Sequence, residues 1–218
     1  MTFADHLGES DRAYLLQQGV QRALAADEVL LREGDPPTHV QLIISGCVRV
    51  STVLSDGREV VLALRGPGDI LGELAALQRG ERAASVRSID PISFVQWSAE
   101  RFLACVHSRP GIAIALAKAI ADRLRDAEAV RVGAASLDVS KRVARYLFEL
   151  ARDRGKSVAG GIAVDVPLSQ EDIAAHLGVS RRAVVQAITM LRGRNIITTG
   201  RMYVVVHRPD ILQNLGRL

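Results

Sequence analysis

Three polar side chains able to read DNA bases lie close together near the C-terminus: Arg181, Arg182 and Gln186. Arginine can bond guanine through two hydrogen bonds, and glutamine can do the same with adenine. Apolar residues recur among them at the spacing of an inward-facing helix stripe, namely Val184, Ile188 and Leu191. The outward face of this helix then carries the two arginines, the glutamine, Val185 and Thr189. This pattern predicts a surface that contacts DNA.

A helix-turn-helix is the element expected to present these side chains. Ser169 is followed three residues later by Asp172, the spacing of a capping box at a helix start. Gly178 supplies a helix-ending turn, and Ser180 is a cap for the second helix. We expect Ser169 and Ser180 to contact DNA as well. An apolar stripe fills the first helix: Ile173, Ala174 and Leu177.

The sequence after these helices predicts a β-hairpin, or wing. The apolar runs 196–199 and 202–206 flank Gly200 and Arg201, and Arg201 could touch a phosphate. Between residues 167 and 218, seven arginines and no lysine stand against three acidic residues, which accounts for the whole net charge of +4. The alternative is a helical hairpin that only packs. The caps, turn, arginines and wing in one order favour DNA binding.

A second set of residues suited to chemistry lies at 72–75 and 82–86. The arginine Arg82 can bind a phosphate anion, and the start of a short helix near Glu73 offers free N–H groups to it. A glutamate can accept a hydrogen bond from a ribose hydroxyl. For an isolated Glu and Arg nine residues apart, an ordinary ion pair on a loop is the alternative. The glycines and small residues around them favour a nucleotide site.

The sequence offers few residues suited to a metal, haem, catalytic or redox site. Cys47 and Cys105 form no CxxC pair and no metal-ligand spacing, and an iron–sulfur cluster needs about four cysteines. The segment 72–82 has no Cys, His or Met to ligate haem. Because no nucleophile–base pair, metal cluster or phosphate-loop motif is visible, we do not expect an enzyme. Buried cysteines of this kind behave as small apolar residues, so redox sensing is disfavoured.

The same features predict a cytoplasmic location. Two unpaired cysteines suit a reducing compartment. No uncharged apolar run reaches the roughly 18 residues that a membrane span needs, and residues 1–6 show no basic leader followed by an apolar stretch. We therefore expect neither a secretory signal nor a membrane partner.

The pattern of residue types along the chain predicts an α+β protein. From about residue 27 to 96, short apolar runs are broken by glycines, and Asp56-Gly57 is a good hairpin turn, which indicates a small β-roll. From Pro110 the sequence predicts one long helix. We therefore expect an N-terminal sensor β-roll at 1–109, a dimerisation helix at 110–137 and a C-terminal winged helix-turn-helix at 138–218.

Residues of the long helix recur every seven positions: Ala113, Ile120, Ala127 and Ala134, with Leu116, Arg123, Val130 and Leu137. This narrow seam predicts pairing with a second copy; the alternative is a helix that lies on its own domain. Asp138 is the expected cap of the next helix, with its apolar face at Val139, Val143, Leu147 and Leu150. The segment 155–161 is expected to be a loop.

One set of residues spread over most of the chain, from about Leu15 to the end, carries a family resemblance: Gly34, Ile44-Ser45-Gly46, Asp56-Gly57-Arg58-Glu59, Pro67-Gly68-Asp69, Gly72-Glu73-Leu74, Arg82, Leu137-Asp138-Val139 and Leu177-Gly178-Val179-Ser180-Arg181. In this order they resemble the family of the catabolite activator protein and the fumarate–nitrate reduction regulator. The resemblance implies a β-roll sensor, a homodimer formed through a long helix, a winged helix-turn-helix that binds a palindromic operator, and contacts with RNA polymerase.

The resemblance also implies ligand contacts. It gives Glu73 the ribose, Arg82 the cyclic phosphate, and the backbones of Gly72, Leu74 and Ala83 supporting contacts. Catabolite activators usually carry Ser or Thr where Ala83 stands, although cyclic-AMP-dependent kinase regulatory domains carry alanine.

The largest departure from the family lies in the long helix. Ala127 and Glu128 stand where the activator places a Thr-Ser pair against adenine. Glu128 either faces solvent or enters the pocket and bonds guanine or the adenine amino group. Cyclic AMP is thus the first expected effector and cyclic GMP the second, with an inert pocket as the alternative.

The DNA reader departs from the activator as well. Arg181 matches the arginine that contacts guanine in the family half-site. Arg182 replaces a glutamate that accepts from cytosine, and Gln186 replaces a second arginine. Because arginine cannot accept that hydrogen bond, we expect a target that differs from the activator's site.

Overall fold

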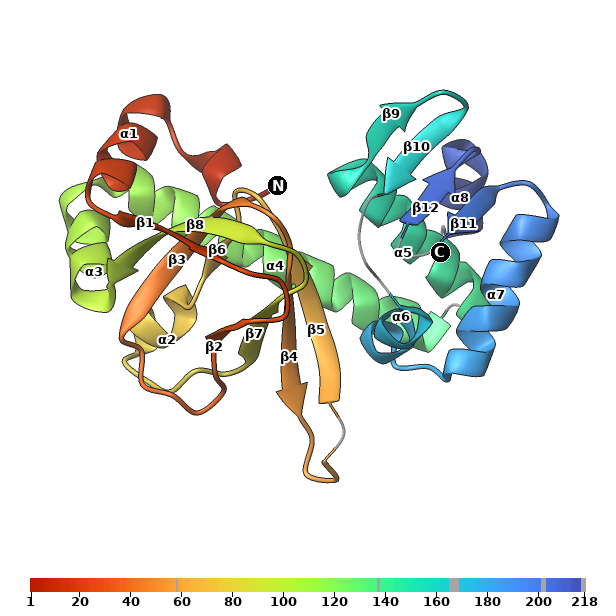
Figure 1. Cartoon of the computed structure of the whole chain (residues 1–218), viewed down its shortest axis with the longest axis horizontal. Helices are drawn as coiled ribbons and strands as arrows, with labels where there is room; N and C mark the ends of the chain where they lie inside the picture. Colours follow the sequence, from red (N-terminus) through yellow and green to blue (C-terminus); the bar gives the residue numbers. More distant parts are fainter. Residues whose placement is uncertain (58, 137, 165–168, 201–202, 217–218) are drawn as a thin grey trace. The chain divides into compact units, whose positions relative to one another are not determined.

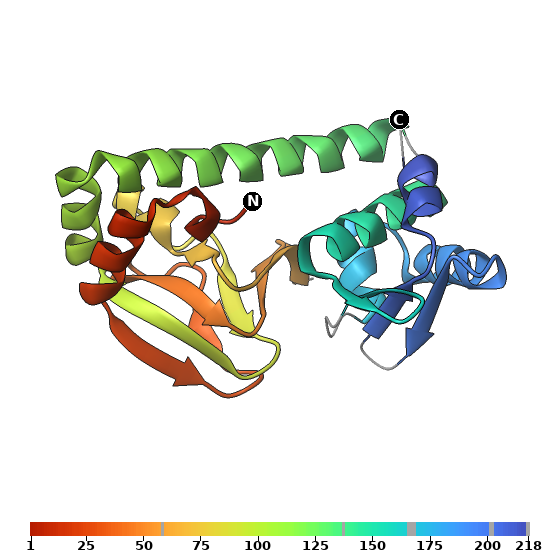
Figure 2. The same cartoon turned by 90° about the horizontal axis from the view of Figure 1, so that it is seen from above.

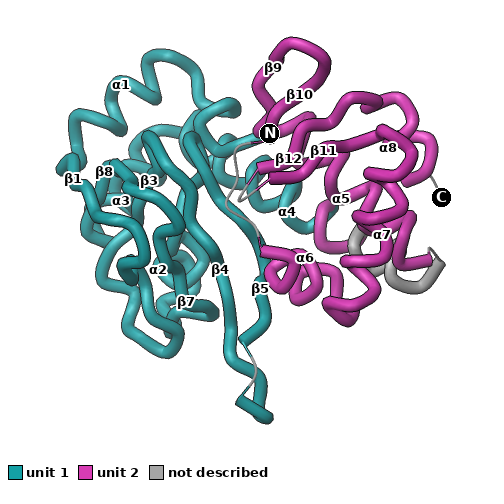
Figure 3. The backbone as a smooth tube through the Cα atoms, turned by 45° about the vertical axis from the view of Figure 1, so that its right-hand side comes forward, with its two compact units in different colours: residues 1–125 teal, residues 126–218 magenta. Residues whose placement is uncertain are grey.

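The structure is a computed structural model that describes residues 1–218 except 58, 137, 165–168, 201–202 and 217–218; the side chains of 129–136 also lie outside the description. The chain forms two compact units, residues 1–125 and 126–218 (Figure 3). Each unit combines helices with antiparallel sheets, so the α+β prediction is confirmed. The predicted three-part boundaries stay a prediction, since the helix expected to be a separate segment contributes to both units.

The first unit is built on two four-stranded antiparallel sheets (Figure 1). One sheet has the order β1-β8-β3-β6 and the other β2-β7-β4-β5. The strands are β1 (Val20–Leu24), β2 (Val29–Leu31), β3 (His39–Ser45), β4 (Val48–Val53), β5 (Glu59–Arg65), β6 (Ile70–Leu71), β7 (Ser85–Ser88) and β8 (Ile92–Ser98). Gly57 has a φ of +83°, so the predicted turn between β4 and β5 uses a backbone conformation that favours glycine. The β-roll is confirmed.

Two apolar clusters hold this unit together. One lies between the two sheets and comprises Leu30, Leu31, Ile43, Val48, Leu71, Val86, Ile92 and Phe94. The other packs helices against the first sheet, with Phe3, Leu15, Trp97 and Phe102 all buried. The Trp97 indole N–H donates to the Leu15 carbonyl at 2.9 Å, so the largest core side chain is also satisfied as a donor.

The helices of the first unit cover the β1-β8-β3-β6 sheet. They are the 3₁₀ turn η1 (Ala4–His6), α1 (Glu9–Gln17), α2 (Glu73–Gln78), α3 (Ala99–Ser108) and α4 (Pro110–Ser136). Figure 2 shows α4 from the side as one long helix, with η1 and α1 along its first part. The sequence prediction omitted η1, α1, α3 and β1.

The predicted seam on α4 is wrong at Leu116, Ile120 and Arg123, whereas the seam position Ala127 is exposed. Leu116 is 3% exposed within the core of the first unit, and Ile120 packs against that core. Arg123 donates to Glu73 and to the Ile70 carbonyl within the same unit. The face exposed instead carries Ile114, Ala117, Ala121 and Leu124, with Ile114 at 56% and Leu124 at 60% exposure. The seam positions 130, 134 and 137 lie outside the described side chains.

The second unit contains the helix-turn-helix and a third antiparallel sheet of order β11-β12-β10-β9. Its elements are α5 (Val139–Arg154), β9 (Lys156–Val158), β10 (Gly161–Val164), α6 (Gln170–Leu177), α7 (Arg181–Gly193), β11 (Ile197–Gly200), β12 (Tyr203–Val206) and α8 (Pro209–Leu215). The expected loop at 155–161 is wrong, because β9 and β10 pair there as a hairpin.

The expected start of α5 is confirmed. The Asp138 carboxylate accepts from the Lys141 N–H at 2.9 Å, as an N-cap does. Val143, Leu147 and Leu150 are buried on the predicted face.

No single helix in the described ranges is long and apolar enough to cross a membrane; only the bent pair Ala99–Ser108 and Pro110–Glu128, with an angle of 111° between them, meets the length and composition limits together.

Candidate functional site

Arg82 is anchored at the centre of the predicted nucleotide site. Its side chain is 4% exposed. One guanidinium nitrogen, Nη1, donates to the Gly72 carbonyl at 2.8 Å, and Nη2 donates to the His39 carbonyl at 2.6 Å. A guanidinium has five N–H donors, so these two bonds leave capacity for an anion. The fork is held in place before any ligand contact is made.

Gly72 makes this approach possible. Its φ is +78°, and a Cβ at this position would lie 2.3 Å from Arg82 Nη1 and 3.1 Å from the His39 carbonyl oxygen. Any side chain would therefore displace the guanidinium. The positive φ also turns the chain from β6 into α2, which puts Glu73 at the first position of the helix.

Glu73 is the second buried charge of this site, and Arg123 of α4 is its partner. The Glu73 side chain is 3% exposed, and its Oε1 accepts from Arg123 Nη1 at 2.6 Å. Arg123 Nη2 donates to the Ile70 carbonyl at 2.6 Å and lies 3.9 Å from Asp69 Oδ1. One arginine thus joins α4 to β6 and to the start of α2.

Sequence analysis missed the role of Arg123, which it placed only in the helix seam. The signal was a charged residue at a position where the repeat is otherwise apolar. A charge there needs a partner when it is covered, and Glu73 supplies one.

The charges around Arg82 act against one another. Burial lowers the pKa of Arg82 below its ordinary value, whereas the carboxylates of Glu73 and Asp35 raise it. Burial also lowers the pKa of His39, and the positive charge of Arg82 lowers it further. A neutral His39 and a charged arginine beside it make this part of the site receptive to an anion.

The other predicted ligand residues lie in two places. Leu74 and Ala83 are exposed and neighbour Glu73 and Arg82 in the chain; the backbone contacts assigned to them stay predictions. Ala127 and Glu128 are exposed on α4, beyond the end of the first unit. Their contact with a ligand stays a prediction.

The predicted helix-turn-helix caps are confirmed in detail. Ser169 Oγ accepts from the Asp172 N–H at 3.0 Å, and the Asp172 carboxylate accepts from the Ser169 N–H at 3.0 Å, which is a complete capping box. Gly178 closes α6 with a φ of +61°. Ser180 Oγ accepts from the Ala183 N–H at 3.2 Å at the start of α7. The hydroxyls of both serines are therefore used in capping, and their contacts with DNA stay predictions.

The outer face of α7 carries the predicted base readers. Arg181, Arg182 and Gln186 are exposed, whereas Val184 and Leu191 are fully buried. Arg181 Nε lies 3.9 Å from Glu171 Oε1, and both side chains are more than 60% exposed, so this pair is weak and leaves the guanidinium available. Arg142 of α5 donates to the Leu177 carbonyl, which ties the end of α6 to α5.

The wing pairs as predicted, with Ile197 opposite Val206 and Gly200 opposite Tyr203. The predicted phosphate contact Arg201 lies outside the described residues. His207 Nδ1 bonds the Gly160 carbonyl at 2.8 Å and Nε2 bonds the Thr198 hydroxyl at 2.7 Å, so one ring joins the two hairpins of this sheet.

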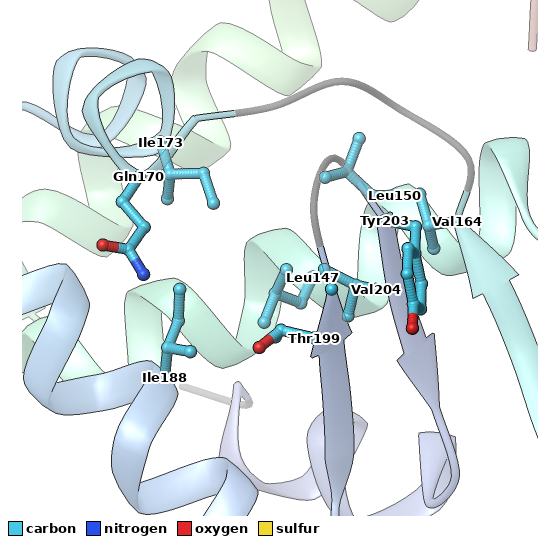
Figure 4. Close-up of a pocket in the computed structure, with 10 residues that line it drawn as sticks. Leu147, Leu150, Val164, Gln170, Ile173, Ile188, Thr199, Tyr203 and Val204 are labelled. Atoms are coloured by element: carbon cyan, nitrogen blue, oxygen red, sulfur yellow. The ribbon is translucent and has the colours of Figure 1, made fainter.

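A cavity of about 90 Å³ lies inside the second unit (Figure 4). It is lined by Leu147, Leu150, Val164, Gln170, Ile173, Ile188, Thr199, Gly200, Tyr203 and Val204. Small-molecule sites usually enclose about 300 Å³ or more, so this cavity is too small for a nucleotide. In the described ranges no three His, Cys, Asp or Glu side chains gather as a metal site.

Two family models match the chain. A cyclic nucleotide-binding domain matches residues 21–109, which contain Gly72, Glu73 and Arg82. A Crp-like helix-turn-helix domain matches residues 141–215, which contain α6, α7 and the wing.

Individual relatives agree with these matches. The CRP-like cAMP-activated global transcriptional regulator of Mycobacterium tuberculosis is 34% identical over 185 residues, 85% of this chain and 83% of the relative. The global nitrogen regulator of Synechocystis sp. is 26% identical over 181 residues, 82% of this chain and 80% of the relative. The structure of FixK2 from Bradyrhizobium japonicum is similar with a TM-score of 0.80 and 26% identity, covering 92% of this chain and 98% of that one.

Proposed function

Because this chain belongs to the CRP family of DNA-binding transcription regulators and carries a cyclic nucleotide-binding domain, we propose that it is a homodimer whose affinity for DNA is controlled by a cyclic nucleotide. Cyclic AMP is the first candidate effector and cyclic GMP the second. The protein acts in the cytoplasm on a palindromic operator and contacts RNA polymerase. It is a regulator and not an enzyme.

One observation carries the effector proposal: Arg82 and Glu73 are both buried, and each is held in place by partners of its own within the protein. Arg82 is held by two backbone carbonyls and keeps donors for a cyclic phosphate. Glu73 is held by Arg123, and a carboxylate has enough lone pairs to accept from a ribose 2′-hydroxyl as well. A pre-positioned site loses less entropy on binding than a mobile one.

Isothermal titration with cyclic AMP and cyclic GMP tests this proposal. We expect binding at micromolar or lower Kd to one of them, and no measurable binding by Arg82→Gln. Arg87→Gln, which changes a 43% exposed arginine on β7, is the matched control and should bind normally. Circular dichroism checks that both variants are folded.

A ligand series on the unaltered protein removes any doubt about folding. The 2′-deoxy analogue of the better nucleotide lacks the hydroxyl assigned to Glu73, and we expect it to bind about ten- to a hundredfold more weakly, since a hydrogen bond to a charged group contributes about 1.5–3 kcal/mol. The linear 5′-monophosphate should also bind more weakly. No heat with either cyclic nucleotide would contradict the effector proposal and leave DNA binding intact.

The alternative within the family is a regulator with another ligand or none. Ala83 lacks the hydroxyl that catabolite activators usually place after the arginine, and Glu128 replaces a small hydroxyl residue. A relative named a global nitrogen regulator is 26% identical to this chain. Glu128→Ser tests whether Glu128 faces a bound nucleotide. If it does, this variant should bind cyclic AMP more tightly than the unaltered protein; if it does not, the affinity should stay the same.

The homodimer proposal rests on the exposed stripe of α4. Ile114, Ala117, Ala121 and Leu124 follow the 3-4-3 spacing of a paired helix. Ile114 and Leu124, at 56% and 60% exposure, are large aliphatic side chains at the two ends of this stripe, and leaving them in water is costly. A second copy of the same helix supplies a matching apolar face, as the twofold symmetry of an operator requires.

These parts suggest a two-state mechanism. Binding of a nucleotide at Glu73 and Arg82 affects α4 through Arg123, and the two paired helices change their relative orientation. The segment between α4 and α5 then re-aims the two recognition helices, which must lie about 34 Å apart to enter successive major grooves. The effector acts only through its different affinity for the two arrangements.

A further inference from the structure

The recognition helix α7 exposes one aliphatic side chain among polar ones. Val185 is 36% exposed, whereas its neighbour Val184 is fully buried. On a helix of about 3.6 residues per turn, Val185 lies about 40° around the axis from Arg181 and about 60° from Arg182. It therefore lies between the two arginines on the outer face of α7 and not at its border.

Packing within the chain gives little reason for a valine here. A β-branched side chain loses rotamer freedom in a helix, so valine is a poorer helix residue than alanine. At this position 36% of the residue stays exposed, so packing within the chain leaves part of this apolar side chain open to a partner. Single exposed aliphatic residues are common on protein surfaces, but this one stands on the face that carries Arg181, Arg182 and Gln186.

The major groove offers an apolar partner at each A·T pair, the 5-methyl group of thymine. We propose that Val185 contacts this methyl group and selects thymine in each half-site. The inference rests on DNA binding through α7. Val185 lies about 6 Å along the helix axis from Arg181, and stacked bases are about 3.4 Å apart. The selected thymine then lies within two base pairs of the guanine that Arg181 bonds.

Deoxyuridine tests the contact directly, because it differs from thymidine only by this methyl group. The probe is the tightest duplex recovered from random double-stranded DNA by in vitro selection with full-length protein, with cyclic AMP, with cyclic GMP and with neither. Each thymine of the selected half-sites is then replaced in turn by deoxyuridine. Binding is measured for the unaltered protein, for Val185→Ala and for Thr189→Ser, which removes a methyl group one turn further along α7.

We expect one thymine in each half-site at which the unaltered protein loses about three- to fourfold in affinity, the value for burial of one methyl group. Val185→Ala should bind the thymine duplex that much more weakly and be insensitive to deoxyuridine at this position. Thr189→Ser should keep the sensitivity. Circular dichroism should show Val185→Ala folded, since alanine favours helix.

Two results would overturn the inference: equal affinity of the unaltered protein for every deoxyuridine duplex, or an undiminished effect of deoxyuridine in Val185→Ala. Recovery of no duplex under any of the three conditions would instead contradict DNA binding by α7, and the inference would fall with it.

Discussion

The ion pair between Glu73 and Arg123 makes the sharpest prediction about stability. Arg123→Met leaves the Glu73 carboxylate, 3% exposed, without its partner at 2.6 Å. Removing one member of a buried pair costs about 3–5 kcal/mol. Because Arg123 itself is 22% exposed and water reaches it, we expect a loss at or just below the bottom of that range, about 2–3 kcal/mol. For a chain of this length that loss lowers Tm by about 5–10 °C.

A double-mutant cycle separates the charge effect from lost packing. Glu73→Gln in the Arg123→Met background removes the unpaired charge, so the double variant should recover about 1–2 kcal/mol relative to Arg123→Met alone. Arg87→Met is the matched control; its partner Asp27 is 85% exposed, and exposed pairs contribute about 0–1 kcal/mol. Unfolding in urea, followed by circular dichroism, measures all four variants: Arg123→Met, Glu73→Gln, the double variant and Arg87→Met. Equal stability of Arg123→Met and the unaltered protein, or no recovery in the double variant, would refute the reasoning.

Three further predictions concern the same unit. Burial and the charge of Arg82 lower the pKa of His39, so as the pH falls the unfolded chain is protonated at this residue before the folded one. Stability should therefore fall as the pH drops below about 6.5, the ordinary histidine value. A phosphate bound at Arg82 offsets the arginine charge, so histidine NMR titration should show the His39 pKa rise with cyclic AMP. Burial raises the pKa of the Cys105 thiol, and Cys105 and Cys47 are 1% and 7% exposed, so a thiol reagent such as DTNB should label neither until the chain unfolds; rapid labelling of either would refute this. Leu124→Glu should shift the protein to monomers in sedimentation, whereas Leu77→Glu, a change at an exposed residue of α2, should leave its association unchanged.

The helix-turn-helix could be predicted because its signals are local. A capping serine and the N–H that donates to it are three residues apart, and the glycine that ends α6 follows its helix directly. Each signal therefore lies within one window of sequence. Ser169, Gly178 and Ser180 therefore mark the ends of α6 and the start of α7 in the sequence itself.

The N-terminal elements could not be predicted in this way. Phe3 and Leu15 are fully buried, yet α1 has only one buried residue and no apolar periodicity to reveal it. Their burial comes from contacts with residues far away in sequence, such as the bond from Trp97 to Leu15. Long-range contacts of this kind leave no periodic trace in the segment that makes them.

The seam on α4 failed for a different reason. The predicted positions 113, 116 and 120 and the exposed positions 114, 117 and 121 differ by one residue, a rotation of about 100° on the helix. Both sets are apolar, so spacing alone does not tell the face that packs on the first unit from the face that stays exposed. Arg123 was the discriminating residue, because a covered charge must lie where a carboxylate can meet it.

This one-residue offset gives α4 a physical means of transmission. Arg123 contacts Glu73, and the adjacent Leu124 belongs to the exposed stripe. Helical hydrogen bonds fix the two side chains about 100° apart, so any displacement of Arg123 that follows a change at Glu73 also turns Leu124. In the proposed homodimer, an effector would therefore need no contact with the partner subunit to alter pairing. A small rotation of α4 is enough, because packed apolar faces resist continuous deformation and exchange between discrete settings.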